Sequence, residues 1–591
     1  MPSNDPLATF EGCPIVMADG KPCGRPLHQD QSELDNRPVC VMHSRDTKKR
    51  GGDFGENMNA ILQCCSTANR ISSRFDFTGF VFPHFEFRQN YDRVVIFKNA
   101  IFILLADFSG SSFATEVDFS DATFMLGARF NKVTFKSNSK FSQATFRGDV
   151  DFTQSTFQGA VDFSGASFGQ LANFSGINFQ VPVDFSRVIA AHEVKFSGTS
   201  FQSTSNFTLA RLTQADFSKT TFHNEATFLE TTHLKHSNFS NAMFIGIARF
   251  SRNTFENSVD FVAASFVMDA IFLDTTFTAG ANFKGAVFSR GADFSYAVLG
   301  PRGGGPTLLP AIADFRDVRF NDPNRALFHH INKNSSQGLK IRLVLSNVEG
   351  VRFADIHWYG EGDRKMVLQD ELDITMSLKI EEGTSVSSEE SKKEIPKSPP
   401  PSYEQIAITY RQLINNFEKV RAFDLTEDCW YGVREMKRLN PYYFVMSRQL
   451  LPYYKRCHWL RWLGERLSFL YLYKKISGYG CSHQRAFMVL FVVIFVFAVV
   501  YPVIGLDEIS DSRRAAHVGL SSIPEMTRAY GAGWLHSLEV ATFQRSPVYV
   551  PSNHLGRLAE IVETIMVPIQ ASLLLLALRR RFRTGSSAAS A

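Results

Sequence analysis

The chain has 591 residues, a formal net charge of +5 at pH 7 and 20% charged residues. This length is too great for one domain, and so small a net charge gives no indication of a nucleic-acid partner. Eight Cys are present without a repeating spacing, and the first residues lack a basic-then-apolar signal. We therefore expect the front of the chain to lie in the reducing cytoplasm.

Residues 1–50 contain a cluster of zinc-ligand residue types with the spacing C-x9-C-x16-C-x2-H. Its members are Cys13, Cys23, Cys40 and His43. Zinc binds four such ligands tetrahedrally, and three Cys with one His is a structural combination. The segment is rich in Pro and Gly, so a metal would supply the missing core. We predict a structural zinc site, with His28 as a possible substitute ligand; the alternative is free thiols on an unfolded tail.

Phenylalanine recurs alternately every five and every six residues from Phe97 to Phe294. Of the 37 positions in this series, 34 are Phe, and the exceptions are Ala190, Leu212 and His233. Such regularity indicates one small structural unit stacked many times. Between Leu212 and Phe217 the step is five where six is expected, which predicts a one-residue deletion and a local kink.

The repeating unit reads D-F-S-x-A-x-F-x-G-x-A over eleven residues. On a helix its two Phe would lie about 140° apart and form no apolar stripe. Small residues two before each Phe instead indicate short strands, with Phe and Ala inward and Ser, Asp and Lys outward. The predicted core includes Phe152, Phe157, Phe163, Phe168, Phe174 and Phe179. Two units per turn give roughly nine coils about 4.8 Å apart.

Residues 75–358 resemble the pentapeptide-repeat family in its Phe-rich, 11-residue variant. The resemblance implies a mainly β fold, a right-handed quadrilateral β-helix, with the regular solenoid over residues 75–300. Some members imitate DNA with an acidic surface, but residues 97–300 carry 17 Asp and Glu against 15 Lys and Arg. DNA mimicry is therefore disfavoured. Core packing is also favoured over an aromatic ligand groove, because a solenoid repeat cannot bury a face alone.

After the solenoid we expect irregular capping coils over residues 301–379, a disordered linker over 380–402 and a helical connector over 403–475. Two amphipathic helices meeting around Ala422 to Glu427 should form an α-helical hairpin. This part resembles the helical segment that joins solenoid to membrane in a family of pentapeptide-repeat membrane proteins. Glu435 and Arg438 are expected to be surface charges rather than catalytic groups.

Residues 486–583 form a predicted two-span transmembrane module. Residues 486–506 carry no charge and are long enough to cross a bilayer, and a second span covers about 561–578. Basic residues precede the first span and follow the second, so both termini should be cytoplasmic. Glu563 and Gln570 are polar within the second span. Such groups usually face protein or water, which predicts a homo-oligomer or a lined cavity.

Between the spans, residues 533–550 resemble the pore helix and filter loop of two-span potassium-channel domains. The filter itself is not preserved: the pore-like loop reads Thr542, Phe543, Gln544, Arg545 and Ser546. Potassium selection needs rings of backbone carbonyls in a Gly-permitted geometry. The loop has no Gly, and a ring of Arg would repel cations, so potassium conduction is not expected.

We expect a protein that is not an enzyme, because no common nucleophile, phosphate-binding or HExxH motif occurs. His233 is expected to be a buried neutral side chain or a local distortion. The favoured function is a membrane-anchored scaffold or sensor whose solenoid binds an unknown cytoplasmic protein. The alternative is an ion channel with a filter of another type, gated by the solenoid. The family resemblance favours a bacterial inner membrane.

Overall fold

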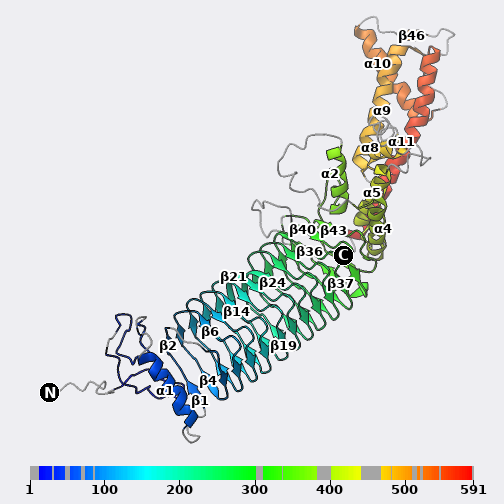
Figure 1. Cartoon of the computed structure of the whole chain (residues 1–591). Helices are drawn as coiled ribbons and strands as arrows, with labels where there is room; N and C mark the ends of the chain where they lie inside the picture. Colours follow the sequence, from blue (N-terminus) through cyan, green and yellow to red (C-terminus); the bar gives the residue numbers. More distant parts are fainter. Residues whose placement is uncertain are drawn as a thin grey trace. The chain divides into compact units, whose positions relative to one another are not determined.

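The structure, a computed structural model, describes residues 12–29, 32–46, 49, 53–67, 74–83, 87–300, 311–333, 335, 337–381, 401–440, 468–480, 482–508, 516–518, 523–544 and 548–588. The chain divides into two compact units (Figure 1). The first comprises Met1–Tyr359 with Leu368–Asp370, and the second Gly360–Val367 with Glu371–Ala591.

The first unit is a β-solenoid of about twelve turns, which confirms the predicted fold class. One turn consists of β14 (Val150–Asp151), β15 (Thr156–Phe157), β16 (Val161–Asp162) and β17 (Ser167–Phe168). Each strand pairs in parallel with the strand 22 residues further along, as Val150 does with Ala172 and Thr156 with Asn178. Two 11-residue units therefore make one four-sided turn.

The corners follow from the D-F-S part of the repeat. The carboxylate of Asp151 accepts a hydrogen bond from the Thr153 N–H at 2.9 Å, and Asp162 does the same for Ser164 at 2.8 Å. The residue after this turn is left-handed, with φ of 61° at Gln154 and 67° at Gly165. Asp and Asn side chains stabilise such turns by bonding their own backbone two residues on. The Asp thus has a structural task beyond facing outward.

The six Phe named above as core residues are buried, each with 0 or 1% exposure. Rings one turn apart stack: Phe152 and Phe174 have centroids 5.0 Å apart and planes within 8°. Neighbouring columns meet edge to face, as Phe152 and Phe163 do at 5.4 Å and 86°. Each such pair contributes about 0.5–1.5 kcal/mol beyond the burial of its area. The rings fill the solenoid and leave no groove among them.

The predicted deletion appears as a change of register between β21 (Ile189–Lys195) and β24 (Arg211–Asp216). Ala190 pairs with Leu212 but Glu193 pairs with Gln214, so β24 is one residue shorter at this corner. Pairs then lie 21 residues apart, as for Phe201 and Phe222. The three exceptions to the Phe series share one column: the pairing runs Phe168, Ala190, Leu212, His233, Phe255.

The end of the solenoid keeps its parallel pairing. β36 (Gly280–Asn282) pairs with β40 (Ile312–Asp314), an offset of 32 residues that places residues 301–310 as an insertion at one corner. Phe315 accordingly stacks on Phe283 at 4.8 Å. Pairing continues to β44 (Arg352–Ala354). The capping region expected over 301–379 is thus regular in its strands up to residue 354.

The second unit begins with the predicted helical hairpin, α4 (Tyr403–Lys419) and α5 (Phe423–Leu439). Ser402 starts α4 through a capping box with Gln405, which satisfies two otherwise free donors. The helices touch where a Cβ at Gly432 would lie 2.4 Å from the Tyr410 ring. The predicted linker lies largely outside the described residues, as do residues 441–467 of the connector.

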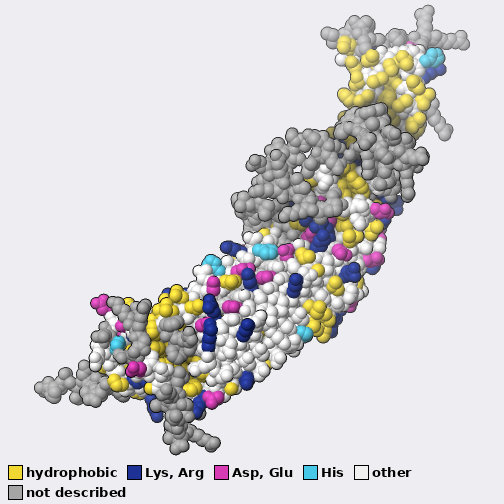
Figure 2. All heavy atoms as spheres, viewed as in Figure 1, with side chains coloured by type: hydrophobic (Ala, Val, Ile, Leu, Met, Phe, Trp, Pro, Cys, Tyr) yellow, Lys and Arg dark blue, Asp and Glu magenta, His cyan; other side chains and the backbone are white. Residues whose placement is uncertain are grey.

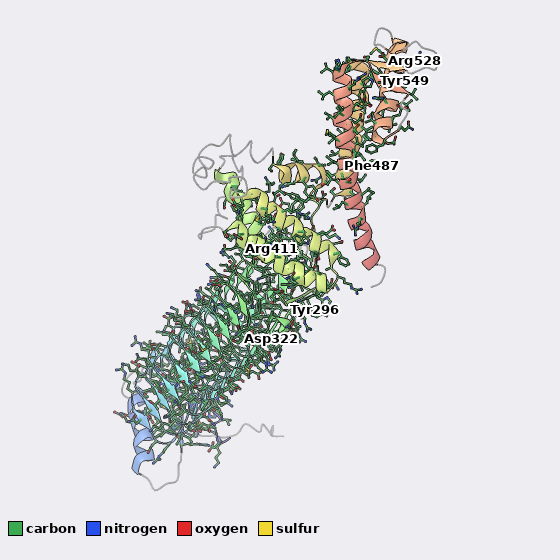
Figure 3. All side chains as sticks on the ribbon, turned by 90° about the vertical axis from the view of Figure 1, so that its right-hand side faces the viewer. Tyr296, Asp322, Arg411, Phe487, Arg528 and Tyr549 are labelled. Carbon is green, nitrogen blue, oxygen red and sulfur yellow. The ribbon has the colours of Figure 1, made fainter. Side chains whose placement is uncertain are left out.

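Three further helices pack together: α9 (His483–Ile504), α10 (Ile523–Ala541) and α11 (His554–Ala588). A small antiparallel sheet joins them, with β45 (Leu506–Glu508) between β46 (Ala516–Val518) and β47 (Tyr549–Pro551). Figure 3 shows Phe487 near the start of α9 and Tyr549 near its other end.

Two of these helices, His483–Ile504 and His554–Arg579, are long and apolar enough to cross a membrane. Only 17% and 22% of their most apolar windows are buried, whereas a core helix of a soluble protein is mostly buried. Figure 2 shows the corresponding hydrophobic surface over this part of the chain. Exposed large side chains include Phe487, Phe491, Phe495, Ile561, Ile565 and Ile569.

Candidate functional site

The predicted zinc ligands come together in one cluster. A two-stranded ribbon brings Cys13 opposite Cys23, since the Cys13 N–H donates to the Arg25 carbonyl at 2.8 Å and the Gly24 N–H to the Cys13 carbonyl at 3.0 Å. A Cβ on Gly12 would lie 2.5 Å from the Gly24 oxygen, so this approach requires Gly at position 12. The other two ligands share a tight turn.

The four ligand atoms lie within 4.8 Å of one another. The Nδ1 atom of His43 is 3.3 Å from Cys13 Sγ and 3.2 Å from Cys40 Sγ, and Cys23 Sγ is 3.9 Å from Cys40 Sγ. Zinc–ligand bonds of about 2.0–2.3 Å in a tetrahedron place ligand atoms about 3.5–3.8 Å apart. The cluster therefore has the donor set and the size for a tetrahedral metal ion. His28 is not part of it.

Electrostatics favour a cation at the centre of the cluster. Hydrogen bonds from Cys13 and Cys40 lower the pKa of Cys23, whereas the neighbouring thiols raise that of Cys40. Burial alone lowers the pKa of His43, but its contact with Cys13 raises it, to about 9. The ligands thus compete for protons, and a divalent metal ion would allow all three Cys to bind as thiolates.

Two basic residues that sequence reasoning missed lie beside the cluster. Arg25 donates to Cys23 Sγ at 3.2 Å. Lys49 is 6% exposed and donates to the Val41 carbonyl at 2.7 Å; burial lowers its pKa to about 7, against the attraction of the Cys40 thiolate. A Cys₃His zinc site has a net charge of −1, which these side chains can balance. Arg25 lies in the CGRP turn, but nothing in the sequence marked Lys49.

The cluster packs on the first turn of the solenoid. His43 Nε2 is 3.0 Å from the Thr78 carbonyl, and the imidazole lies edge-on to Phe80 at 5.0 Å. A backbone hydrogen bond of 2.8 Å runs from the Val81 N–H to the Met42 carbonyl. A carbonyl on the second nitrogen fixes the orientation of a metal-binding His. The cluster therefore helps to cover the end of the solenoid, which would otherwise expose Phe rings and strand edges.

A family model described as pentapeptide repeats (9 copies) matches residues 97–143, 141–189 and 239–287. The solenoid is built of pentapeptide repeats. The protein QnrB1, a plasmid-mediated fluoroquinolone resistance protein of known structure, is similar at 16% identity and a TM-score of 0.11, over 46% of this chain and 87% of its own. We draw no conclusion from that likeness. No curated protein sequence matches the chain.

The stretch of pentapeptide repeats outside these matches, residues 190–238, contains the irregular corner. A hollow of about 250 Å³ lies over this corner. Its lining includes Asp149, His192, Glu193, Gln214 and Lys235. Gln214 approaches Glu193 at 3.4 Å, and Lys195 pairs with Glu193 at 3.4 Å. The solenoid thus departs from its repeat where it presents a polar hollow with charges of both signs.

The surface position predicted for Glu435 and Arg438 is wrong. Glu435 is 4% exposed and accepts hydrogen bonds from Arg438 at 2.7 Å, Lys474 at 2.7 Å and Tyr479 at 3.0 Å. Burial raises the pKa of Glu435, but Arg438 and Lys474 lower it, to about 2. A carboxylate held by three donors joins α5 to α8 (Phe469–Ser477) and is not available for acid–base chemistry.

The pore-like loop follows α10, which is 19 residues long, about 28 Å. Thr542, Phe543 and Gln544 are exposed at its end, and Arg545 and Ser546 lie outside the described residues. The polar residues of the second span are buried within the same chain. Gln570 donates to the Ala486 carbonyl at 2.6 Å, and Glu563 meets side chains of α9 and α10.

Proposed function

We propose that this protein is a non-catalytic, membrane-anchored scaffold of pentapeptide repeats. The observation that carries the proposal is the exposed apolar surface of α9 and α11, which would be costly in water and matches a bilayer. Arg485 at the start of α9 and Arg579 near the end of the second span place both termini on the cytoplasmic side. The membrane is a bacterial inner membrane in this proposal, and the solenoid faces the cytoplasm.

Zinc at Cys13, Cys23, Cys40 and His43 belongs to the same proposal as a structural ion. The four ligands would fill its coordination sphere and leave no position for a substrate. Its task would be to fix residues 12–46 over the first turn of the solenoid. The support is the size of the cluster and the contact from His43 to the Thr78 carbonyl.

The cytoplasmic partner of the scaffold binds, in this proposal, at the polar hollow beside β21 and β24. Local departures from a consistent repeat are expected at functional sites. Here four departures coincide: Ala190, Leu212, His233 and the deletion. Glu193 and Lys235 give the hollow both signs of charge, which suits a folded protein surface with complementary ion pairs.

Ion conduction through an oligomer is the alternative. The inward polar groups of the second span do not favour it, because Glu563 and Gln570 find their partners in the same chain. They therefore do not require neighbouring subunits or a water-filled cavity. Planar-bilayer recording decides between the two: ionic currents from purified wild-type protein would support the channel, and silence would support the anchor.

Membrane anchoring predicts that the wild-type chain stays in the membrane fraction after an alkaline carbonate wash. A double change of Phe491 and Phe495 to Arg should release it or leave it misfolded, because each Arg costs about 2.5–3.5 kcal/mol at the centre of a span. Both rings are exposed on α9. The matched control is Leu126→Arg on the solenoid, which is also exposed and should change nothing. Wild-type protein found in the wash would refute the proposal.

A further inference from the structure

Glu563 occupies the centre of the three-helix packing. The side chain projects from α11 and is 0% exposed. Tyr501 of α9 donates to Glu563 Oε2 at 2.7 Å, and the hydroxyl of Ser537 on α10 is hydrogen-bonded to Glu563 Oε1. One carboxyl group therefore touches both neighbouring helices.

The number of protons in this group of atoms is informative. Ser537 Oγ lies within hydrogen-bonding distance of Glu563 Oε1 and also of the Ile494 carbonyl oxygen, at 3.1 Å. A hydroxyl has one proton, and carbonyl and carboxylate oxygens can only accept. If Glu563 were ionised, Ser537 could therefore serve one of its two acceptors but not both.

A proton on Glu563 Oε1 satisfies every atom. Glu563 then donates to Ser537, Ser537 donates to the Ile494 carbonyl, and Tyr501 donates to Glu563 Oε2. All three contacts become complete hydrogen bonds. Buried polar groups are normally fully bonded, so the neutral acid is the assignment that the geometry favours.

The charges around Glu563 lead to the same assignment. In the described part of the bundle no Lys or Arg pairs with it. Another carboxylate, Glu560, lies one turn earlier on α11. On α10 the buried His536 is edge-on to the Tyr501 ring at 4.6 Å, and its Nδ1 lies 3.9 Å from Glu539 rather than from Glu563. Neither ring nitrogen of His536 makes a hydrogen bond to a described residue. An unpaired ionised carboxylate is strongly disfavoured in such surroundings.

We propose that Glu563 is a proton-binding site of the membrane module, occupied at neutral pH. The bound proton ties α11 to α9 and α10. Its loss in more alkaline solution leaves one surplus acceptor and an unpaired negative charge, and so loosens α10. The inference rests on the proposed function only in taking the surroundings of the bundle to be a bilayer or detergent.

The first test is infrared difference spectroscopy of wild-type protein against Glu563→Gln in detergent at pH 7. We expect the wild type to show the carbonyl stretch of a protonated carboxyl group that the variant lacks. Loss of a carboxylate band instead would overturn the proposal. If the variant does not fold, a pH titration of that band in wild-type protein supplies the same decision.

The second test is thermal unfolding. Gln has the same shape and can donate to Ser537, so Glu563→Gln should melt within about 2 °C of wild type at pH 7, a difference below roughly 1 kcal/mol. Wild-type protein should lose stability between pH 7 and pH 10 by more than the variant does. Equal slopes, or a variant much weaker at pH 7, would contradict the bound proton. Carbonate washing of the same membranes separates this result from a failure of membrane anchoring.

Discussion

Replacing Cys40 with Ser is expected to abolish metal binding and to unfold residues 12–46 from the end of the solenoid. Cys40 is 1% exposed and contacts both His43 and Cys23, and no hydrophobic core of comparable size holds this segment. Structural zinc contributes about 10–16 kcal/mol to the folding of small zinc-finger peptides, so its loss should exceed the local stability. Hydrogen exchange should show protection lost in residues 12–46 and retained around the stacked Phe rings.

A strong chelator should have the same effect on the wild type, and restored zinc should reverse it. The control is Cys429→Ala, which removes a buried thiol of α5 and should leave one zinc per chain. Wild-type protein purified without metal, yet protected over residues 12–46, would show that the cluster does not depend on an ion.

Acid should destabilise the solenoid through His233, and His233→Phe should remove this effect. The imidazole is 0% exposed, and burial lowers its pKa to about 3; in the unfolded chain its pKa is about 6.5. Below pH 6.5 the unfolded state therefore binds a proton that the folded state does not. Stability is complete above pH 6.5 and falls as the pH is lowered toward 3, by up to about 5 kcal/mol at 1.36 kcal/mol per unit.

Denaturant unfolding of the solenoid at pH 7, 5 and 4 measures this loss. The difference between wild type and His233→Phe isolates one side chain from the other titrating groups. Phe also restores the ring that Phe255 stacks against at 4.4 Å. Because Ser237 donates to or accepts from His233 at 2.8 Å, the second variant His233→Phe with Ser237→Ala avoids a newly unpaired hydroxyl. Parallel pH profiles for all three proteins would contradict a neutral buried His233.

The solenoid could be predicted from the sequence because its core period is visible in every turn. A Phe at each fifth and sixth position has one packing solution, and even the deletion after Leu212 was readable as a missing residue. The clustering of Ala190, Leu212 and His233 in one column was not, because it depends on the 22-residue offset between paired strands. The hollow above them depends on that register too.

The candidate sites were predictable only in their ligating atoms. Residue type and spacing indicated the Cys and His of the metal cluster, but Lys49 reaches it through backbone carbonyls that no pattern announces. Glu435 reads as a polar position of an amphipathic helix, and its burial depends on Lys474 arriving from another helix. For Glu563 the sequence indicated a protein-facing group but not that its partners, Tyr501 and Ser537, belong to the same chain.

The stacking of identical turns gives the solenoid an adjustable length. Phe124 stacks on Phe146, which stacks on Phe168, so excising residues 141–162 would bring Phe124 against Phe168 with every later contact unchanged. Each such step shortens the rod by about 4.8 Å, and each 22-residue duplication lengthens it equally. The solenoid can therefore serve as a ruler whose span is changed in whole turns, without redesign of either end.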